Sequence, residues 1–520
     1  MLWWSLHGQP LRAIVGLLAT TVLVALLIAA CTRTWRRFLL VCLPLLPLGL
    51  AYASYALTYG VVPGHTLAML LAGASIEEIE GLFALWQQKW LLLPAAAALG
   101  GYVWLAWRFG NVPIYSRPVI LTSRVLLALA VAASGYAATS AAQLVQGAAL
   151  NPVTGSVMFF AGALPRAYAE LRGALVAKVP YHGRRTGTGE EVHVLVVGES
   201  ARRDSWSVYG YDRQTTPYLE SLKGDAIFLQ HAMADANLTT LSVPMILTGI
   251  PPARMGGPIT GNLVDLAKEA GYSTAWLVNQ DISVSTAIGI APDHLELPPD
   301  AGRQFFGRNL PDGVLLPAYR RELARTGVPR FIGLHIMESH WEYYRRYPPQ
   351  FQHFGHTGGL GMMSIALADR HVAQAVQDAY DNSVLYTDWF LRQLIEPLRA
   401  LPVPATLLFI PDHGETLQLL DGGRVGHGSP NYSPSQFEIP AFVWVNAAYR
   451  RAHPDIVAAI AANAGREIRS HNVFYTEAQI MGITWPGQDL HQSFASPQFV
   501  PDRSREHLAG GRLVVRPPGA

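Results

Sequence analysis

The chain has 520 residues, of which 50% are hydrophobic and 15% charged, whereas a soluble domain usually carries about 25% charged residues. The charge is unevenly distributed, because residues 1–150 hold only eight of the 39 basic and three of the 37 acidic residues. This pattern excludes a single soluble globule and a disordered polymer, and the remainder is too close to neutral for a nucleic-acid binder built on a basic surface.

Four uncharged apolar runs in the first 150 residues are long enough to cross a bilayer as helices, which takes about 20 residues. They lie at residues 13–32, 38–59, 90–107 and 125–144. Arginines cluster in the loops that follow the first and the third run. Because short loops rich in Lys and Arg stay in the cytoplasm, we expect the segment 60–89 and everything after the fourth helix to face outward. Four crossings place the N-terminus outside, so a further helix upstream of residue 1 is an alternative.

The composition changes after the fourth run. Residues 151–190 contain Gly, Pro and mixed charge and are predicted to form a membrane-proximal connector. From residue 191 to 520, short apolar runs rich in β-branched residues alternate with helical patterns, which predicts an α/β domain with a mainly parallel sheet covered by helices on both faces. The clearest predicted strands are 192–197, 273–278, 331–336, 405–410 and 441–445, and the clearest helix is 382–398.

Two of these strands end in residues that an ordinary core would avoid. Glu199 follows the first strand, and the sequence Asp-His-Gly-Glu at 412–415 follows the fourth. Both cysteines, Cys31 and Cys42, lie in the apolar N-terminal part, so the outward domain has no thiol ligand and no disulfide. Carboxylates with a histidine form a mixed oxygen and nitrogen site suited to zinc or manganese. Catalytic residues of parallel sheets gather at such strand ends.

A series of motifs in this domain resembles the catalytic domain of bacterial inner-membrane phosphoethanolamine transferases, which belong to the alkaline phosphatase and sulfatase superfamily. The resemblance covers the outward domain and the general membrane-then-periplasm layout, and it implies an alkaline phosphatase/sulfatase-like fold. In chain order the motifs are VVGESARRD (196–204), YGYDRQTTP (209–217), NLTTLSVP (237–244), LHIMESH (334–340), YDNSVLYTD (380–388), DHGE (412–415) and GHG (426–428).

Carried across position by position, the resemblance implies a metal-activated nucleophile. Thr239 would be the nucleophile and, with Glu199, Asp412 and His413, a ligand of one zinc ion, with manganese as the second choice of metal. Thr240 is the neighbouring alternative nucleophile. A threonine hydroxyl is a poor nucleophile near neutral pH, and coordination to a divalent cation lowers its pKa.

Four further residues are expected at the site, and the resemblance implies three of them, His340, His427 and Glu78. His340 and His427 match histidines that hold the substrate phosphate or a second zinc, and either could protonate the leaving oxygen. Glu415 is expected to accept a hydrogen bond behind these groups. Glu78, in the outward segment 60–89, matches a glutamate that contributes to the donor site of the family.

The resemblance implies transfer of phosphoethanolamine from phosphatidylethanolamine, through a covalent threonine intermediate, to a cell-envelope glycolipid or glycan: lipopolysaccharide core, lipid A or a periplasmic glucan. The enzyme would be a multi-pass protein of the bacterial inner membrane with its catalytic domain in the periplasm, and nucleic acid would not be a partner. Alternatives are a membrane phosphoglycerol transferase or a phosphodiesterase on the same scaffold, and an inactive envelope scaffold protein. A sulfatase is disfavoured because no outward cysteine is available for its modified nucleophile.

Overall fold

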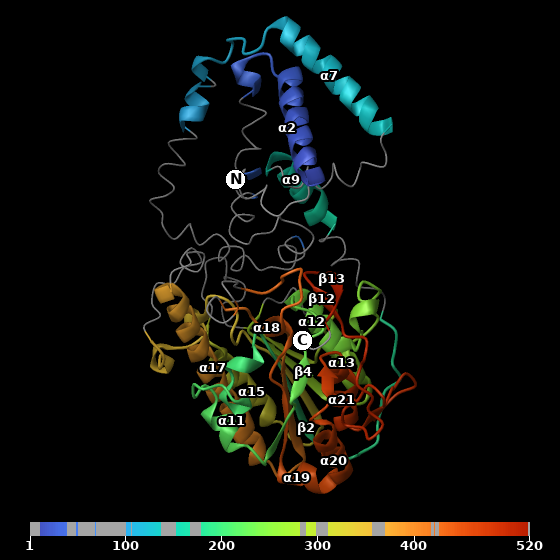
Figure 1. The fold of residues 1–520 in the computed structure, drawn as a ribbon. Coiled ribbons are helices and arrows are strands. Elements are labelled where there is room, and N and C mark those ends of the chain that lie inside the picture. Colours follow the sequence, from blue (N-terminus) through green and yellow to red (C-terminus); the bar gives the residue numbers. More distant parts are fainter. Residues whose placement is uncertain are drawn as a thin grey trace. The chain divides into compact units, whose positions relative to one another are not determined.

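The structure is a computed structural model, and the described residues fall into two compact units (Figure 1). The first unit holds the described residues from 11 to 166, and the second holds those from 178 to 517. Glu78 and most of the apolar runs 38–59 and 90–107 lie outside the described residues. The described residues are 11–38, 48–49, 52, 68, 100–105, 107–136, 152–166, 178–280, 288–297, 310–355, 370–417, 421 and 426–517.

The first unit contains the helices α2 (Leu11–Cys31), α7 (Arg117–Tyr136) and α9 (Pro152–Met158), the last followed by a π-helical turn, Phe159–Ala163. α2 covers nearly all of the first apolar run, and α7 begins before the fourth run and overlaps it. Arg124 of α7 donates a hydrogen bond to the carbonyl of Ala30 near the end of α2, with 3.2 Å between Nε and O. Within the described ranges, no helix combines the length and the apolar character that crossing a membrane requires.

The second unit is built on one seven-stranded sheet. Its strands are β2 (Val192–Gly198), β3 (Ala226–Phe228), β5 (Ser273–Val278), β6 (His294–Glu296), β7 (Arg330–His335), β8 (Ala405–Pro411) and β9 (Phe442–Val445). Their order across the sheet is β3-β9-β8-β2-β7-β5-β6. Only β9 runs antiparallel to its neighbours, and the other neighbouring strands are parallel. The mainly parallel sheet that the sequence predicted is confirmed.

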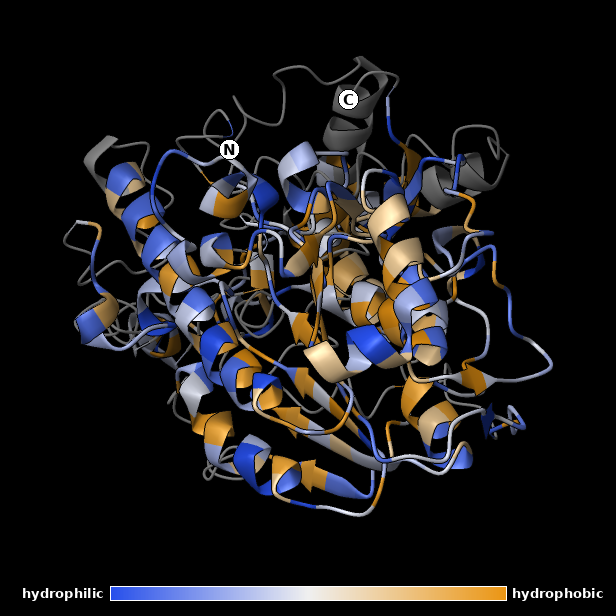
Figure 2. Cartoon of the chain, turned by 90° about the horizontal axis from the view of Figure 1, so that it is seen from below, coloured by the Kyte–Doolittle hydropathy of each residue, from blue (hydrophilic) through white to orange (hydrophobic). Residues whose placement is uncertain are grey.

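The central strand β2 is buried on both faces. Leu195 and Val197 belong to one apolar cluster, and Val194 and Val196 belong to another, with all four side chains fully buried. Successive side chains of a strand point to opposite faces, so the two clusters lie on the two faces of the sheet. In Figure 2 the central strands are largely hydrophobic, whereas the surrounding helices also carry hydrophilic residues. A continuous apolar run in β2 is what a strand covered on both faces requires.

Helices pack against the sheet and contribute residues to each apolar cluster. The first cluster includes residues of α12 (Thr239–Thr248), α13 (Leu263–Glu269), α20 (Pro454–Asn463) and α21 (Asn472–Ile480). The second includes residues of α11 (Pro217–Ser221), α15 (Leu316–Leu323) and α17 (Arg370–Arg399). Figure 1 shows α15 and α17 on one side of the sheet and α13 and α21 on the other. The prediction of helices on both faces is therefore confirmed.

Shorter elements complete the second unit. Two more helices flank β9 in the chain, α18 (Pro434–Phe437) before it and α19 (Ala447–Ala452) after it. Three small sheets pair β1 (Arg184–Arg185) with β11 (Ile483–Thr484), β4 (His231–Met233) with β10 (Glu467–Arg469), and β12 (Glu506–Ala509) with β13 (Arg512–Val515). The β4 and β10 pair is parallel, and the other two pairs are antiparallel.

The chain entering the second unit is fixed before it reaches β2. The backbone N–H groups of Tyr181 and Gly183 donate to the two carboxylate oxygens of Glu269 at the end of α13, at 3.0 and 3.1 Å. β1 then pairs with β11, which belongs to the last part of the chain. The segment before β2 is therefore anchored to α13 and to β11.

Sequence patterns locate the central elements closely. The predicted strand 273–278 coincides with β5, and the other four predicted strands differ from the observed ones by a residue or two at an end. The predicted helix 382–398 lies within α17, which begins at Arg370. The edge strands β3 and β6 were not predicted, because each has only three residues and such a short run carries no readable periodicity.

Glu477 of α21 gives the second unit a pH-dependent stability. Both carboxylate oxygens are buried and make no hydrogen bond with the described residues, and burial raises the pKa of Glu477 from 4.5 to about 8. Between these two pH values the folded state keeps a proton that the unfolded state releases, so stability falls as the pH rises.

We therefore expect Glu477→Gln to raise the melting temperature of the full chain at pH 8 by roughly 8 °C, since keeping the buried carboxyl protonated from pH 4.5 up to pH 8 costs on the order of 4 kcal/mol. The gain should disappear near pH 4.5, where the wild-type carboxyl is neutral. Melting curves across this range, with the partly exposed Glu220→Gln as the matched control, test this expectation. A gain that does not depend on pH would contradict it.

Candidate active site

The register of the sheet brings two predicted ligands together. In the β2 and β8 pair, Gly198 lies opposite Pro411, so the residues that follow, Glu199 and Asp412, leave the same edge of the sheet. The backbone N–H of Ser200 donates to Asp412 Oδ1 at 3.1 Å. Parallel strands end at a common edge, which is why residues more than 200 positions apart meet here.

Glu199, Asp412 and His413 form a compact group of possible metal ligands. One ligand atom from each residue lies within 4.8 Å of the others, and all three side chains are fully buried. His413 Nε2 is 3.4 Å from Asp412 Oδ2 and 3.6 Å from Glu199 Oε1. No other group of three or more Cys, His, Asp or Glu side chains among the described residues has ligand atoms this close together.

The hydrogen bonds of His413 show which of its nitrogens faces this group. Nδ1 lies 2.9 Å from the carbonyl oxygen of Gly414, which can only accept, so Nδ1 carries the proton. Burial lowers the pKa of His413 well below its usual value, and the neutral ring then directs an Nε2 lone pair at the carboxylates. Asp412 Oδ2 is buried and accepts no hydrogen bond from the described residues, and burial raises the pKa of Asp412. The converging lone pairs of two carboxylates and a neutral imidazole fit a bound cation.

Thr239 adjoins the same group. It is the first residue of α12, and its hydroxyl lies 3.2 and 3.4 Å from the two carboxylate oxygens of Glu199 and 3.4 Å from His413 Nε2. A hydroxyl has one proton and can satisfy only one of these acceptors at a time. The hydroxyl of Thr240 is buried and makes no hydrogen bond with the described residues. Thr239, and not Thr240, is therefore the threonine whose hydroxyl lies within 3.4 Å of Glu199 and His413.

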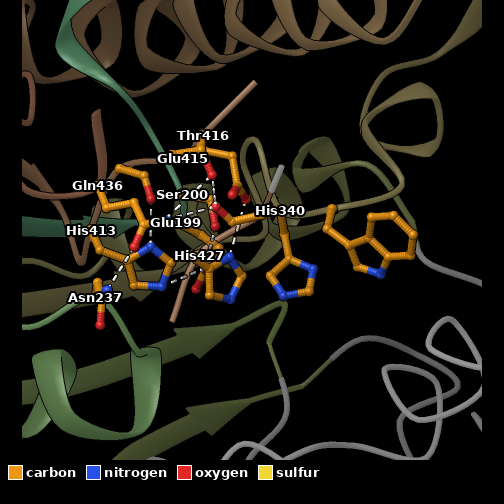
Figure 3. Close-up of polar contacts among 12 residues, drawn as sticks. Glu199, Ser200, Asn237, His340, His413, Glu415, Thr416, His427 and Gln436 are labelled. Carbon is orange, nitrogen blue, oxygen red and sulfur yellow. Dashed lines mark hydrogen bonds and ion pairs between the residues drawn. The ribbon is translucent and has the colours of Figure 1, made fainter. Parts of the chain in front are cut away.

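His413, His427 and His340 lie in a row (Figure 3). The ring centres of His413 and His427 are 4.3 Å apart, and those of His427 and His340 are 5.9 Å apart. His427 Nδ1 is 3.1 Å from Glu415 Oε2, and Glu415 is fully buried. Arg346 donates from Nε to the carbonyl of His340 at 2.8 Å. The three imidazole rings of His413, His427 and His340 thus form a histidine strip that begins at the group of ligands.

Two further side chains hold Glu199, and one of them, Gln280, was not predicted as part of the site. Gln280 lies beyond the end of β5 and donates from Nε2 to Glu199 Oε2 at 2.8 Å. The backbone N–H of Glu199 donates to Glu338 Oε2, also at 2.8 Å, and burial raises the pKa of Glu338 well above its usual value. A β-carbon on Gly198 would lie 2.0 Å from the same Glu338 oxygen, so this position requires glycine. The position of Gln280 after a predicted strand was the signal that could have identified it.

Most predicted site residues come together, and one lies outside the described residues. Glu78, expected at the donor site, is the exception. Those that the structure brings together are Glu199, Thr239, His340, Asp412, His413, Glu415 and His427.

Comparisons with known proteins identify relatives of the chain. The phosphoethanolamine transferase EptA of Salmonella typhimurium is 28% identical over 309 residues, which are 57% of this chain and 54% of that protein. The putative transferase YhbX of Escherichia coli is 30% identical over 262 residues, 49% of this chain and 44% of that protein. The chain therefore matches only about half the length of these relatives.

Solved structures share the fold. The integral membrane protein lipooligosaccharide phosphoethanolamine transferase A (EptA) of Neisseria meningitidis gives a TM-score of 0.66 at 22% identity, over 85% of this chain and 84% of that one. The C-terminal periplasmic domain of EptC from Escherichia coli, in complex with Zn, gives 0.57 at 22% identity, over 65% and 96%. At such identities the likeness establishes the fold alone.

The family match covers the elements that carry the site. The model of the family described as Sulfatase matches residues 192–483, which begin at β2 and include every described site residue above. The match extends over more than half of the 520 residues. The chain belongs to the sulfatase family.

Proposed function

We propose that the chain transfers phosphoethanolamine from phosphatidylethanolamine, through a covalent Thr239 intermediate, to a glycolipid or glycan of the bacterial envelope. The observation that carries the proposal is the contact of the Thr239 hydroxyl with Glu199 and His413, beside Asp412. The names of the relatives, phosphoethanolamine transferases, support the choice of the transferred group.

Zinc is the proposed metal. The converging oxygen and nitrogen atoms fit it, as does Asp412 Oδ2, which accepts no hydrogen bond from the described residues. A zinc complex of the EptC domain supports the choice. Glu199, Asp412, His413 and Thr239 would hold one ion, with a second ion at the histidine strip as the alternative. When bound, the ion would lower the pKa of the threonine hydroxyl and offset charge on the phosphoryl oxygens.

The transfer has two balanced steps. In the first, Thr239 Oγ1 attacks phosphorus, a phosphorus–oxygen bond to Thr239 forms, and the bond to the diacylglycerol oxygen breaks. In the second, an oxygen of the acceptor attacks phosphorus and frees Thr239. The first N–H groups of an α-helix have no carbonyl partner within it, so the start of α12 would stabilise negative charge on the phosphoryl group.

The histidines would handle protons and phosphoryl charge. Glu415 Oε2 lies 3.1 Å from Nδ1 of His427 and orients its ring, which would exchange a proton with the leaving or attacking oxygen. His340, next in the row, would hold a phosphoryl oxygen. These roles require that the two rings keep their positions relative to Thr239.

A lipid donor calls for a membrane location. The four apolar runs and their arginine-rich loops support a multi-pass protein of the inner membrane, with residues 191–520 in the periplasm. Two solved structures support the same arrangement, since EptA of Neisseria meningitidis is an integral membrane protein and the EptC structure is a periplasmic domain. In this arrangement Glu78 would lie in an outward segment and contact the donor head group.

Incubation of the purified full chain with labelled phosphatidylethanolamine, and separately with labelled phosphatidylglycerol, tests the proposal. We expect diacylglycerol to be released from phosphatidylethanolamine. Release from phosphatidylglycerol alone would identify a phosphoglycerol transferase instead, and release from neither would support an inactive scaffold. Mass spectrometry of envelope glycolipids and glucans from cells with and without the protein would then identify the acceptor.

Thr239→Ala should lower transfer at least about 1,000-fold, because it removes the nucleophile. The phosphoethanolamine adduct seen on the peptide containing residue 239 of wild type should also disappear. Thr240→Ala is the matched control, since the Thr240 hydroxyl contacts no described ligand. An adduct that survives in Thr239→Ala and is lost in Thr240→Ala would assign the nucleophile to Thr240.

Asp412→Asn should weaken zinc binding at least about 100-fold, because an amide is a poorer ligand than a carboxylate. The affinity can be measured by competition with a fluorescent zinc chelator, which requires no turnover. Glu477→Gln, another buried carboxyl-to-amide change in the same unit, is the control and should bind zinc as wild type does. Equal zinc affinities in wild type and Asp412→Asn would rule out the proposed ligand set.

A further inference from the structure

The segment that leads to Thr239 is held by a buried amide. Asn237 is fully buried, and the backbone N–H of Gly510 donates to its Oδ1 at 2.8 Å. Its Nδ2 donates to the carbonyl of Ser429 at 2.9 Å and to Gln436 Oε1 at 2.6 Å. The donor and the carbonyl around it fix which side of the amide is oxygen. Each side of Asn237 therefore has a separate contact, the oxygen with the β12–β13 hairpin and the nitrogen with residues beyond His427.

Gln436 continues the chain of amides (Figure 3). Its Nε2 donates to the carbonyl of Gly426 at 3.1 Å, and its own backbone carbonyl accepts from the N–H of Gly414 at 2.9 Å. Gly414 directly follows His413, and Gly426 directly precedes His427. A β-carbon on Gly414 would lie 2.1 Å from the carbonyl oxygen of Ser435, so glycine is needed for this approach. Gln436 thus contacts the backbone beside two of the three histidines in the row.

The backbone of Asn237 also binds the loop that carries His427. Its carbonyl accepts from the N–H of Gly428 at 2.9 Å, so that both neighbours of His427 are bound, Gly426 through Gln436 and Gly428 through Asn237. Gly426 and Gly428 have φ values of 83° and 73°, which favour glycine. Because Asn237 is two residues before Thr239, the side chains and backbone carbonyls of Asn237 and Gln436 together connect the threonine with the residues beside His413 and His427.

We infer that Asn237 and Gln436 are positioning residues, which set the places of Thr239, His413 and His427 relative to one another. The inference rests on the proposed function for its kinetic consequence. Neither side chain is among the proposed metal ligands, and both act through the backbone and hydrogen-bonding groups of the residues beside the reacting ones. Buried amides with every polar group bonded hold a geometry closely, since each broken bond leaves an unsatisfied group.

Two isosteric changes test the inference. Asn237→Asp keeps Oδ1 and its contact with Gly510, but places an oxygen against Gln436 Oε1 and the carbonyl of Ser429. Gln436→Glu keeps Oε1 for Asn237 but places an oxygen against the carbonyl of Gly426. We expect each to lower kcat for diacylglycerol release from phosphatidylethanolamine about 10- to 100-fold, with KM changed by less than about twofold, because displacement by ~1 Å is enough for such a loss.

Asn463→Asp is the matched control. Asn463 is also buried, donates from Nδ2 to the carbonyls of Phe494 and Ser496 at 3.0 and 2.9 Å, and accepts from Arg466 through Oδ1. Its conversion should lower the melting temperature as the other two changes do, but leave kcat at the wild-type value. Equal losses of kcat in all three variants would show that the effect is general destabilisation, and would overturn the inference.

Hydrogen exchange gives a readout that needs no turnover. Peptides covering residues 411–417 and 426–430 should exchange faster in Asn237→Asp and Gln436→Glu than in wild type and Asn463→Asp. Unchanged exchange in these peptides, or wild-type kcat in both variants, would overturn the inference. A wild-type chain that releases no diacylglycerol would instead contradict the proposed function, and the exchange measurement would still decide whether the two amides hold the histidine loops.

Discussion

Gly198 lies opposite Pro411, and a shift of this pairing by one residue would turn Glu199 and Asp412 to different faces of the sheet. The contacts of the site follow from this register. The register places the two carboxylates side by side. His413 joins them because it directly follows Asp412, and α12 places the Thr239 hydroxyl next to Glu199. The apolar side chains of β2, buried in both clusters, keep the register fixed, so the core of the sheet determines the geometry of the chemistry.

Two strained backbone positions lie beside the ligands. Ser200 and Glu338 have φ values of 56° and 37°, in a region that costs a non-glycine residue about 1–3 kcal/mol. Asp312 accepts from the N–H groups of Met337 and Glu338 at 2.8 and 2.9 Å. The Tyr380 hydroxyl of α17 donates to the carbonyl of Ser200 and accepts from the N–H of Arg202, at 2.8 Å each. The helix α17 and the carboxylate of Asp312 therefore hold the strained turns in place before any substrate arrives.

The sequence was informative where the chemistry is concentrated in short motifs. Apolar runs ending in Glu199 and in the Asp-His pair predicted both the strands and the ligands at their ends, because parallel strands share an edge. Spacing alone could not separate Thr239 from Thr240. The two differ in which hydroxyl reaches Glu199, and that depends on how α12 is seated against β8, where Ser242 donates to the carbonyl of Asp412.

Isolated polar residues could not be predicted in the same way. Gln280, Asn237 and Gln436 each act through hydrogen bonds to segments far away in the chain, and a single amide in a loop has no periodicity. The length of α17 was also underestimated, because the first part of this helix carries polar residues among its apolar ones.

The way in which the chain enters the second unit has a mechanical consequence. Tyr181 and Gly183 bind Glu269, and β1 pairs with β11, all before the chain reaches β2. A pull on the chain at residue 178 would therefore load these peripheral contacts before it reached the central strand. They protect the register of β2, and with it the distances from Thr239 to Glu199 and His413, against displacement of the chain before them.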